Sequence, residues 1–392
     1  MEKNKTEKVE RMYILNLILF MALLVVGNSC IRIVKEVTDY IEVDKLGYWN
    51  RSLHYNTTLN FKANGIADED KFYSIGPGGL AIHTNLETSP NTDAPNTNTL
   101  GHSHKPVMSE KMSARFSGNQ FRAVNLRMNK VNATDFYFAP AAFKEDFKDY
   151  AFLLRRFDTK FGVFNENNNR FVTIITGPNA PFYGYGTNTY FLYLDFIATQ
   201  ESHYISITDI GYWDDIKPSG AMHFHKNNFY AGISTSGLYH LVEISNDNNV
   251  TILPNPLGIN EAISAFVTFQ DHLFVQMHYN GLLGYSFDTV NWHEIARITP
   301  ARSDWRAIDD YLFTYWGDRV YFIENVFGSI ALYGLPVANV EGATITSVSK
   351  FKDDLVLTTT NGIYFKSFEL VMKDKERRYP KGDRFHLGEL GD

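Results

Sequence analysis

The chain has 392 residues, a formal net charge of −7, and 30 Phe and 23 Tyr beside a single Cys. The acidic balance argues against the basic patch of a nucleic-acid binder, so we expect no nucleic-acid partner. One cysteine excludes an internal disulfide framework and a cysteine-rich metal site, and we expect no cofactor. The many aromatic residues favour β-sheets, and the length suits two or three domains or one long repeat array.

Residues 1–29 have the composition of a secretory signal peptide. Basic residues lie before Tyr13, an apolar run continues to Val26, and small residues close the segment at Ser29. The apolar run is shorter than the roughly 20 residues that a membrane-spanning helix needs. We therefore expect the folded part of the chain to lie outside the cytoplasm.

Cys30, the single cysteine, directly follows this small-residue site. The arrangement resembles a bacterial lipoprotein signal, although Gly27 stands where such signals usually carry Leu. The resemblance implies that Cys30 is lipidated, becomes the mature N-terminus and anchors the protein to a membrane of the cell envelope. Plain secretion and an uncleaved signal anchor are the alternatives. We expect residues 30–46 to form a tether.

The segment Asp271–Trp292 predicts a β-hairpin. Alternating apolar runs flank Asn280-Gly281, a dipeptide that favours a tight turn because both residues tolerate positive φ. Similar hairpins recur around Gly79, Gly237, Gly328 and Gly362. A period of roughly 40 to 50 residues with short strands indicates a β-propeller of four-stranded blades. We predict an all-β propeller of seven blades over residues 47–372, with six or eight blades as alternatives.

The best-spaced repeats predict the strands of two blades. One blade contains Ile263–Phe269, Leu273–Tyr279, Leu282–Phe287 and His293–Ile298. The last blade contains Thr344–Phe351, Leu355–Thr360 and Ile363–Leu370. We expect its fourth strand to come from Tyr48–Leu59 at the N-terminal side, because blades bury their faces only against neighbours and the ring has to close.

Two wider gaps interrupt the spacing of the hairpin glycines. They lie on either side of Gly162, and each is about twice the usual interval. We therefore predict one degenerate repeat in each gap, at Phe121–Pro140 and at Thr189–Trp213.

Two other segments do not fit the repeat. Residues 87–117 are rich in Pro, Asn, Thr and Ser without an apolar period, which predicts a long polar insertion. Residues 373–392 are charged with little to bury, which predicts a loose C-terminal tail.

The segment Ser286–Trp292 (SFDTVNW) follows the third strand of the best-defined blade. It resembles the Asp-box loop of sialidase-like propellers, but it is one residue shorter and lacks the glycine. The resemblance implies that Ser286, Asp288 and Trp292 are structural: Asp accepts backbone N–H bonds and Trp packs between blades. A weaker copy contains Asp209 and Trp213. Neither loop identifies catalytic residues, which stay unassigned.

Two His-x-His pairs, His102/His104 and His223/His225, have the spacing that places both imidazoles on one face of a strand. Such pairs can bind a metal, but neither has a carboxylate neighbour at ligand spacing. We expect the first pair to be solvated and the second to be packed or hydrogen-bonded, and we predict no metal site.

Aromatic residues on a Gly-rich stretch offer a different kind of site. Phe182, Tyr183 and Tyr185 form a surface for stacking on sugar rings, or else pack between blades. Three acidic pairs have the composition of a two-carboxylate glycosidase site, but their positions favour turns. These pairs are Asp214-Asp215, Asp309-Asp310 and Asp353-Asp354.

These patterns predict an exported, lipid-anchored propeller that binds a glycan or protein ligand at an end of the ring, where loops converge. A propeller glycoside hydrolase or lyase acting on extracellular polysaccharide is the alternative. An enzyme is expected to gather acidic, basic and histidine side chains at one pocket. A scaffold is expected to have no such cluster in its central channel.

Overall fold

The computed structural model describes residues 48–52, 64–68, 70–76, 79–87, 107–108, 112–117, 120–125, 162–165, 169–179, 186–198, 203–213, 216–298, 303–324, 326–327, 331–337, 339–340, 342–373 and 387–388. The predicted signal peptide, Cys30 and the predicted tether lie outside these residues, as do Phe182, Tyr183 and Tyr185. Among the helices that are described, none has the length and hydrophobicity to cross a membrane. The elements below belong to one unit, Trp49–Asp392.

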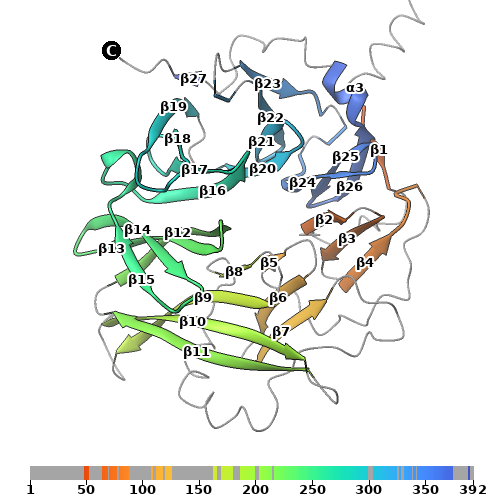
Figure 1. The fold of residues 1–392 in the computed structure, drawn as a ribbon. Helices are drawn as coiled ribbons and strands as arrows, with labels where there is room; N and C mark the ends of the chain where they lie inside the picture. Colours follow the sequence, from red (N-terminus) through yellow and green to blue (C-terminus); the bar gives the residue numbers. More distant parts are fainter. Residues whose placement is uncertain are drawn as a thin grey trace, which may run out of the picture. The chain divides into compact units, whose positions relative to one another are not determined.

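The described residues form seven antiparallel sheets that follow one another along the chain (Figure 1). The first contains β2 (Asn64–Asp68), β3 (Lys71–Gly76) and β4 (Gly79–His83). The second contains β5 (Val107–Met108), β6 (Met112–Ser117) and β7 (Gln120–Asn125). The third contains β8 (Gly162–Phe164), β9 (Arg170–Asn179), β10 (Gly186–Ala198) and β11 (His203–Trp213).

The later sheets are more regular. The fourth contains β12 (Ile216–His225), β13 (Asn228–Thr235), β14 (Leu238–Ser245) and β15 (Val250–Leu253). The fifth contains β16 (Ile263–Phe269), β17 (His272–Met277), β18 (Leu282–Ser286) and β19 (His293–Ile298). The sixth contains β20 (Asp304–Ile308), β21 (Tyr311–Trp316), β22 (Arg319–Glu324) and β23 (Ala331–Leu335). The seventh contains β24 (Ile345–Phe351), β25 (Asp354–Thr359), β26 (Gly362–Ser367) and β1 (Asn50–Arg51).

The first strands of neighbouring sheets touch one another. Contacts run from β5 through β8, β12, β16, β20 and β24 to β2, so these strands form the inner layer of a ring. This arrangement is a β-propeller, and the predicted fold class is confirmed. The number of sheets in the described residues equals the seven blades that the sequence predicted. The strands predicted for the fifth sheet match β16 to β19 within two residues at each end.

Side chains on one strand alternate between two neighbouring sheets. On β25, Leu355 and Leu357 pack in a cluster shared with the sixth sheet, whereas Val356 packs in a cluster shared with the first. Successive side chains of a strand point to opposite faces, so each sheet is buried on both sides. This explains why nearly every residue of β21 and β25 is buried, instead of every second one. The core is therefore a set of layers between blades.

The N-terminal strand closes the ring as predicted. Asn50 pairs with Phe365 and Arg51 with Tyr364, and the Ser52 amide donates to the Ile363 carbonyl at 2.9 Å. The strand β1 thereby becomes the fourth strand of the sheet that ends the repeat array.

Trp49 fixes the start of this closing strand. Its side chain is 3% exposed and packs in the cluster between the sixth and seventh sheets. Its indole Nε1 donates to the Pro336 carbonyl at 3.0 Å. The Asn339 side chain accepts from the Trp49 amide at 3.0 Å and donates to the Trp49 carbonyl at 2.6 Å. Both backbone groups and the ring are thus held by the connection between the last two sheets.

Two of the predicted repeats do not form sheets of their own in the structure. Thr189–Trp213 is not a repeat of its own, because β10 and β11 are the outer strands of the sheet that begins at Gly162. Gly162 does not mark a hairpin turn, because a glycine is needed there for packing. A Cβ at position 162 would lie 2.0 Å from the Phe171 ring. Of the other predicted repeat, the described part is β7, the third strand of the second sheet.

Three predicted boundaries are also wrong. Strands β5 and β6 lie inside the segment 87–117 that was predicted to be an insertion. In the predicted loose tail, β27 (Leu387–Gly388) pairs with β19 as a fifth strand. The last predicted strand ends early, and α3 (Phe368–Lys373) follows it. Apolar residues at Phe368, Val371 and Met372 have helical spacing and cover the cluster between the last two sheets.

Replacing Trp49 with Ala is expected to lower the free energy of unfolding by about 3–5 kcal/mol, because a fully buried indole is removed from the ring closure. Chemical denaturation monitored by circular dichroism measures the change. The matched control is Tyr48→Ala, whose ring is 55% exposed, and we expect it to change stability by less than about 0.5 kcal/mol. Equal effects of the two substitutions would contradict the role assigned to Trp49.

Candidate functional site

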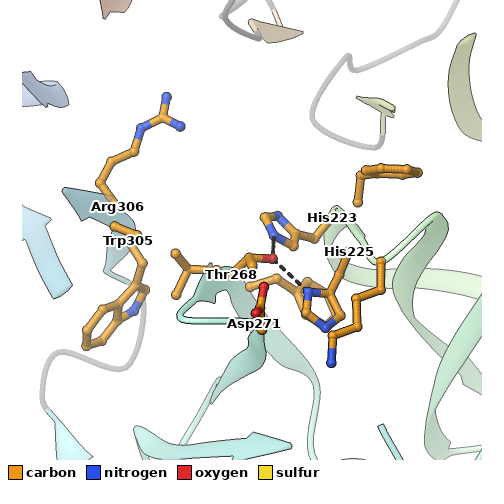
Figure 2. A pocket seen from close by; sticks show the side chains of 11 residues that line it. His223, His225, Thr268, Asp271, Trp305 and Arg306 are labelled. Atoms are coloured by element: carbon orange, nitrogen blue, oxygen red, sulfur yellow. Dashed lines mark hydrogen bonds between the residues drawn. The ribbon is translucent and has the colours of Figure 1, made fainter. Parts of the chain in front are cut away.

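A pocket of about 370 Å³ lies beside the ends of three inner strands, β12, β16 and β20. The neighbouring sheets of the ring therefore contribute one wall each. Figure 2 shows the polar side chains that line the pocket, together with one indole. They are His223, His225, Thr268, Asp271, Trp305 and Arg306.

Two histidines of β12 converge on one hydroxyl of β16. His223 and His225 are two residues apart on the strand, so their side chains lie on the same face. His223 Nε2 lies 2.8 Å and His225 Nδ1 lies 3.0 Å from Thr268 Oγ1. A hydroxyl has one proton to donate, so at most one imidazole accepts from Thr268 and at least one donates to it. Because His223 makes its contact through Nε2 and His225 through Nδ1, an arrangement of one accepting and one donating ring gives both rings the same tautomer.

Both imidazoles are held in the neutral form. Burial, together with smaller contributions from the charges of His225 and Arg306, lowers the pKa of His223 to about 3. Burial also lowers the pKa of His225 to about 4, with a smaller contribution from Lys226. His225 is 2% exposed, and its Nε2 atom has no hydrogen-bond partner among the described residues. This second ring nitrogen of His225 is thus buried beside the pocket without a hydrogen bond to the described residues.

The opposite side of the pocket comes from β20. Trp305 and Arg306 leave this strand in opposite directions (Figure 2). The Trp305 indole is buried, and its Nε1 donates to Gln276 Oε1 at 3.1 Å. Gln276 in turn donates to the Ile298 carbonyl at 3.2 Å and accepts from the Ser303 hydroxyl at 3.0 Å. This buried network fixes β20 against the fifth sheet and leaves Arg306 at the pocket.

A rigid loop lies next to the pocket. Asp288 Oδ1 accepts from the amides of Val290 and Asn291 at 3.0 and 2.8 Å, and from the Ser286 hydroxyl at 3.0 Å. These hydrogen bonds, those from Asn291 above all, hold the pKa of the Asp288 carboxyl far below its usual range. The Lys226 ammonium, which lines the pocket, donates to the Phe287 carbonyl at 2.8 Å. The loop is therefore tied to the pocket wall.

Trp292 ends this loop and packs against the cluster shared by the fourth and fifth sheets. Its indole Nε1 donates to the Thr289 carbonyl at 3.2 Å. The contacts of Ser286, Asp288 and Trp292 are thus local and interblade, and the resemblance to an Asp-box stays a prediction. The weaker copy was placed wrongly, because Asp209 and Trp213 lie within the continuous strand β11 instead of a loop. Its residues face β10 in the ladder and have no turn to stabilise.

Sequence reasoning found part of the pocket. The hydrogen-bonded state expected for His223 and His225 is confirmed. Thr268 and Arg306 were missed, because neither residue type is informative until the blades are aligned side by side. The turn assigned to Asp309 is also confirmed, since its φ is 49° at the hairpin between β20 and β21. The pair His102/His104 lies outside the described residues.

Metal binding finds no support in the part of the chain that the structure describes. There, no three His, Cys, Asp or Glu side chains are grouped as metal ligands. In the pocket, each imidazole already uses one nitrogen on Thr268. The arrangement offers hydrogen-bond donors and acceptors together with the Arg306 guanidinium, which suits a polar ligand.

No protein-family model matches the chain, and no curated protein matches it. Among solved structures it is similar to PorZ, a surface component of the type-IX secretion system of Porphyromonas gingivalis, with 16% identity and a TM-score of 0.47 over 81% of this chain and 37% of that one. It is also similar to the extracellular domain of BT4673 from B. thetaiotaomicron, with 12% identity and a TM-score of 0.48 over 81% and 39% of the two chains.

A third similar structure is virginiamycin B lyase from Staphylococcus aureus, with 10% identity and a TM-score of 0.47 over 80% of this chain and 96% of the lyase. The chain spans less than two fifths of the length of the first two structures. Identities this low transfer no activity, and the propeller fold rests on the chain's own strand pairing.

The two histidines make stability depend on pH. Both folded-state pKa values lie below the ordinary value of 6.5, so the unfolded chain binds protons that the folded chain refuses. Their contribution is fully present above about pH 6.5 and declines as the pH falls toward about 4, by up to about 1.4 kcal/mol per pH unit for each histidine. Urea unfolding at a series of pH values measures this decline.

The control is the double variant His223→Gln/His225→Asn, whose amides replace the two nitrogens that contact Thr268. We expect it to lose the part of the pH dependence that the histidines supply. A stability difference between the two proteins that stays constant from about pH 7 to about pH 4 would contradict the neutral state of the pair.

Proposed function

We propose that the protein is an exported binding module that takes a glycan in the pocket between β12, β16 and β20. The observation that supports this most is the combination of two neutral imidazoles, the Thr268 hydroxyl and the Arg306 guanidinium around one cavity. Such groups donate to and accept from sugar hydroxyls, and the buried rings are already oriented by Thr268. A preoriented site loses little conformational entropy when it binds.

The protonation state favours binding over catalysis. A general acid or base works best when its pKa lies near the working pH, and pKa values of about 3 and about 4 make both histidines weak bases. A glycosidase of the usual type needs two carboxyl groups. Of the described residues that line the pocket, Asp271 alone carries one. The alternative of a hydrolase or lyase therefore lacks a supporting observation at this site.

We also propose that Cys30 carries a lipid that attaches the propeller to the cell envelope, on the basis of the signal-like segment before it. Mass spectrometry of the mature N-terminus in the membrane fraction is expected to find an acyl mass on Cys30. The Cys30→Ala variant is expected to lose that mass and to leave the membrane fraction. An unmodified N-terminus in the soluble fraction would mean plain secretion instead.

His225→Asn tests the pocket as the glycan site. The Asn amide replaces Nδ1 beside Thr268 but removes the rest of the imidazole from the pocket wall, so we expect glycan affinity to fall by about tenfold while the fold is kept. The readout is a glycan array followed by calorimetry on the full chain. The control is His240→Asn, on β14 and outside the residues that line the pocket, which is expected to bind like the wild type.

The same glycans are incubated with the protein and assayed for new reducing ends and for unsaturated products. Turnover that His225→Asn abolishes would replace the binding function with an enzymatic one. Glycan binding that neither variant changes would place the site elsewhere on the propeller.

A further inference from the structure

The charge at the pocket is opposite in sign to that of the whole chain. Lys226 and Arg306 contribute two cations against the single carboxylate of Asp271, while the chain as a whole carries −7. The histidines add no charge, because both are neutral near pH 7. A local positive potential attracts an anionic ligand. The single carboxylate in the cavity repels that ligand only weakly.

Arg306 is the cation that is available to such a ligand. Its side chain is half-buried, and it makes no hydrogen bond or ion pair with any described residue. Lys226, by contrast, already donates to the Phe287 carbonyl and lies 3.3 Å from the centre of the Phe287 ring. A guanidinium matches the geometry of a carboxylate through two parallel N–H bonds, which an ammonium cannot provide.

The histidines face Arg306 from the other side of the pocket (Figure 2). Both histidines line the pocket and are neutral, so they add polar contacts there without adding charge. The site therefore offers a charged contact on one side and a neutral hydrogen-bonding contact on the other. A sugar ring with one carboxylate carries both complementary groups.

An exposed aromatic ring continues the site. Phe287 is 60% exposed, although it lies in a loop whose backbone is fixed by the hydrogen bonds of Asp288. The ring touches Lys226 at the pocket and packs edge-on against His272, the residue after Asp271. A rigid, exposed ring beside a polar pocket is the arrangement that stacks on the apolar face of a sugar.

Resting on the proposed function, we propose that the ligand is an acidic oligosaccharide: one carboxylate-bearing sugar lies in the pocket between Arg306 and the two histidines, and the adjoining sugar stacks on Phe287. The carboxylate binds the Arg306 guanidinium, the ring of the same sugar lies against the two histidines, and the chain leaves the pocket past Lys226.

The test compares uronic-acid oligosaccharides with the same series after reduction of every carboxyl to an alcohol. The wild-type full chain is expected to bind the acidic series about tenfold more tightly. Arg306→Gln is expected to abolish that preference, so that the variant binds the acidic and the reduced series equally well. The control Arg319→Gln, at the start of β22 and outside the pocket, is expected to keep the preference.

The loop offers a matched pair of variants for the stacking contact. Phe287→Ala is expected to weaken binding of disaccharides and longer chains by about fivefold and to leave single acidic sugars unaffected. Val290→Ala, on the same loop and 70% exposed, is expected to change neither. Equal weakening for single sugars and longer chains would overturn the assignment of the second sugar to Phe287.

The pH dependence separates Arg306 from the histidines as the anion-binding group. The charged and titratable groups around the pocket are His223, His225, Lys226, Asp271, His272 and Arg306. Because the first two stay neutral, the variant His272→Gln, which lacks the remaining imidazole, is expected to change its affinity for the acidic series by less than about twofold from about pH 8 to about pH 5.5. Binding that strengthens steadily on acidification would show that a protonated imidazole holds the carboxylate, which overturns the proposal.

The outcomes distinguish this inference from the function on which it rests. Equal binding of the acidic and the reduced series would overturn the acidic-sugar inference and keep the glycan-binding function. Binding of a short acidic peptide without binding of any glycan would overturn both. Preferential binding of the acidic series that Arg306→Gln removes supports both.

Discussion

Each sheet of this propeller depends on its neighbours for burial. Leu355, Val356 and Leu357 are consecutive residues of one strand, yet they belong to clusters on opposite sides of their sheet. A sheet with two apolar faces has no stable isolated form in water, so the ring is stabilised by interfaces between blades. The pocket is a product of the same constraint, since neighbouring inner strands lie close enough for His223 of one sheet to reach Thr268 of the next.

The sequence predicts this architecture well where the repeats are regular. The strands on either side of Asn280-Gly281 follow from local chemistry, and the structure has them. The connection is longer than the predicted tight turn, since it spans residues 278–281, and of the dipeptide only Gly281 has a positive φ. The prediction fails where one residue type serves two purposes. Gly162 was taken as a turn marker, but it is a glycine because the Phe171 ring occupies the space of its Cβ. Periodicity cannot distinguish these two reasons.

The site was less predictable than the fold. The spacing of His223 and His225 shows that they share a face, which is local information. Their partner Thr268 lies more than forty residues away and Arg306 lies a further blade along, so neither follows without the relative alignment of three sheets. The neutral state of the histidines depends on burial, which is also a property of the assembled ring. Chemistry at the pocket is thus decided by interblade geometry.

The closing strand has a mechanical consequence. The strand β1 directly follows Trp49, so a pulling force on the chain before Trp49 acts on the propeller at its seam, the point where β1 pairs with β26 and closes the ring. Only two residues of β1 pair with β26, so the ladder alone would peel apart under modest force. Two further contacts resist such a force. The Trp49 indole is buried between the last two blades, and the Asn339 side chain hydrogen-bonds both the amide and the carbonyl of Trp49. These contacts therefore hold the seam more strongly than the two-residue ladder would alone.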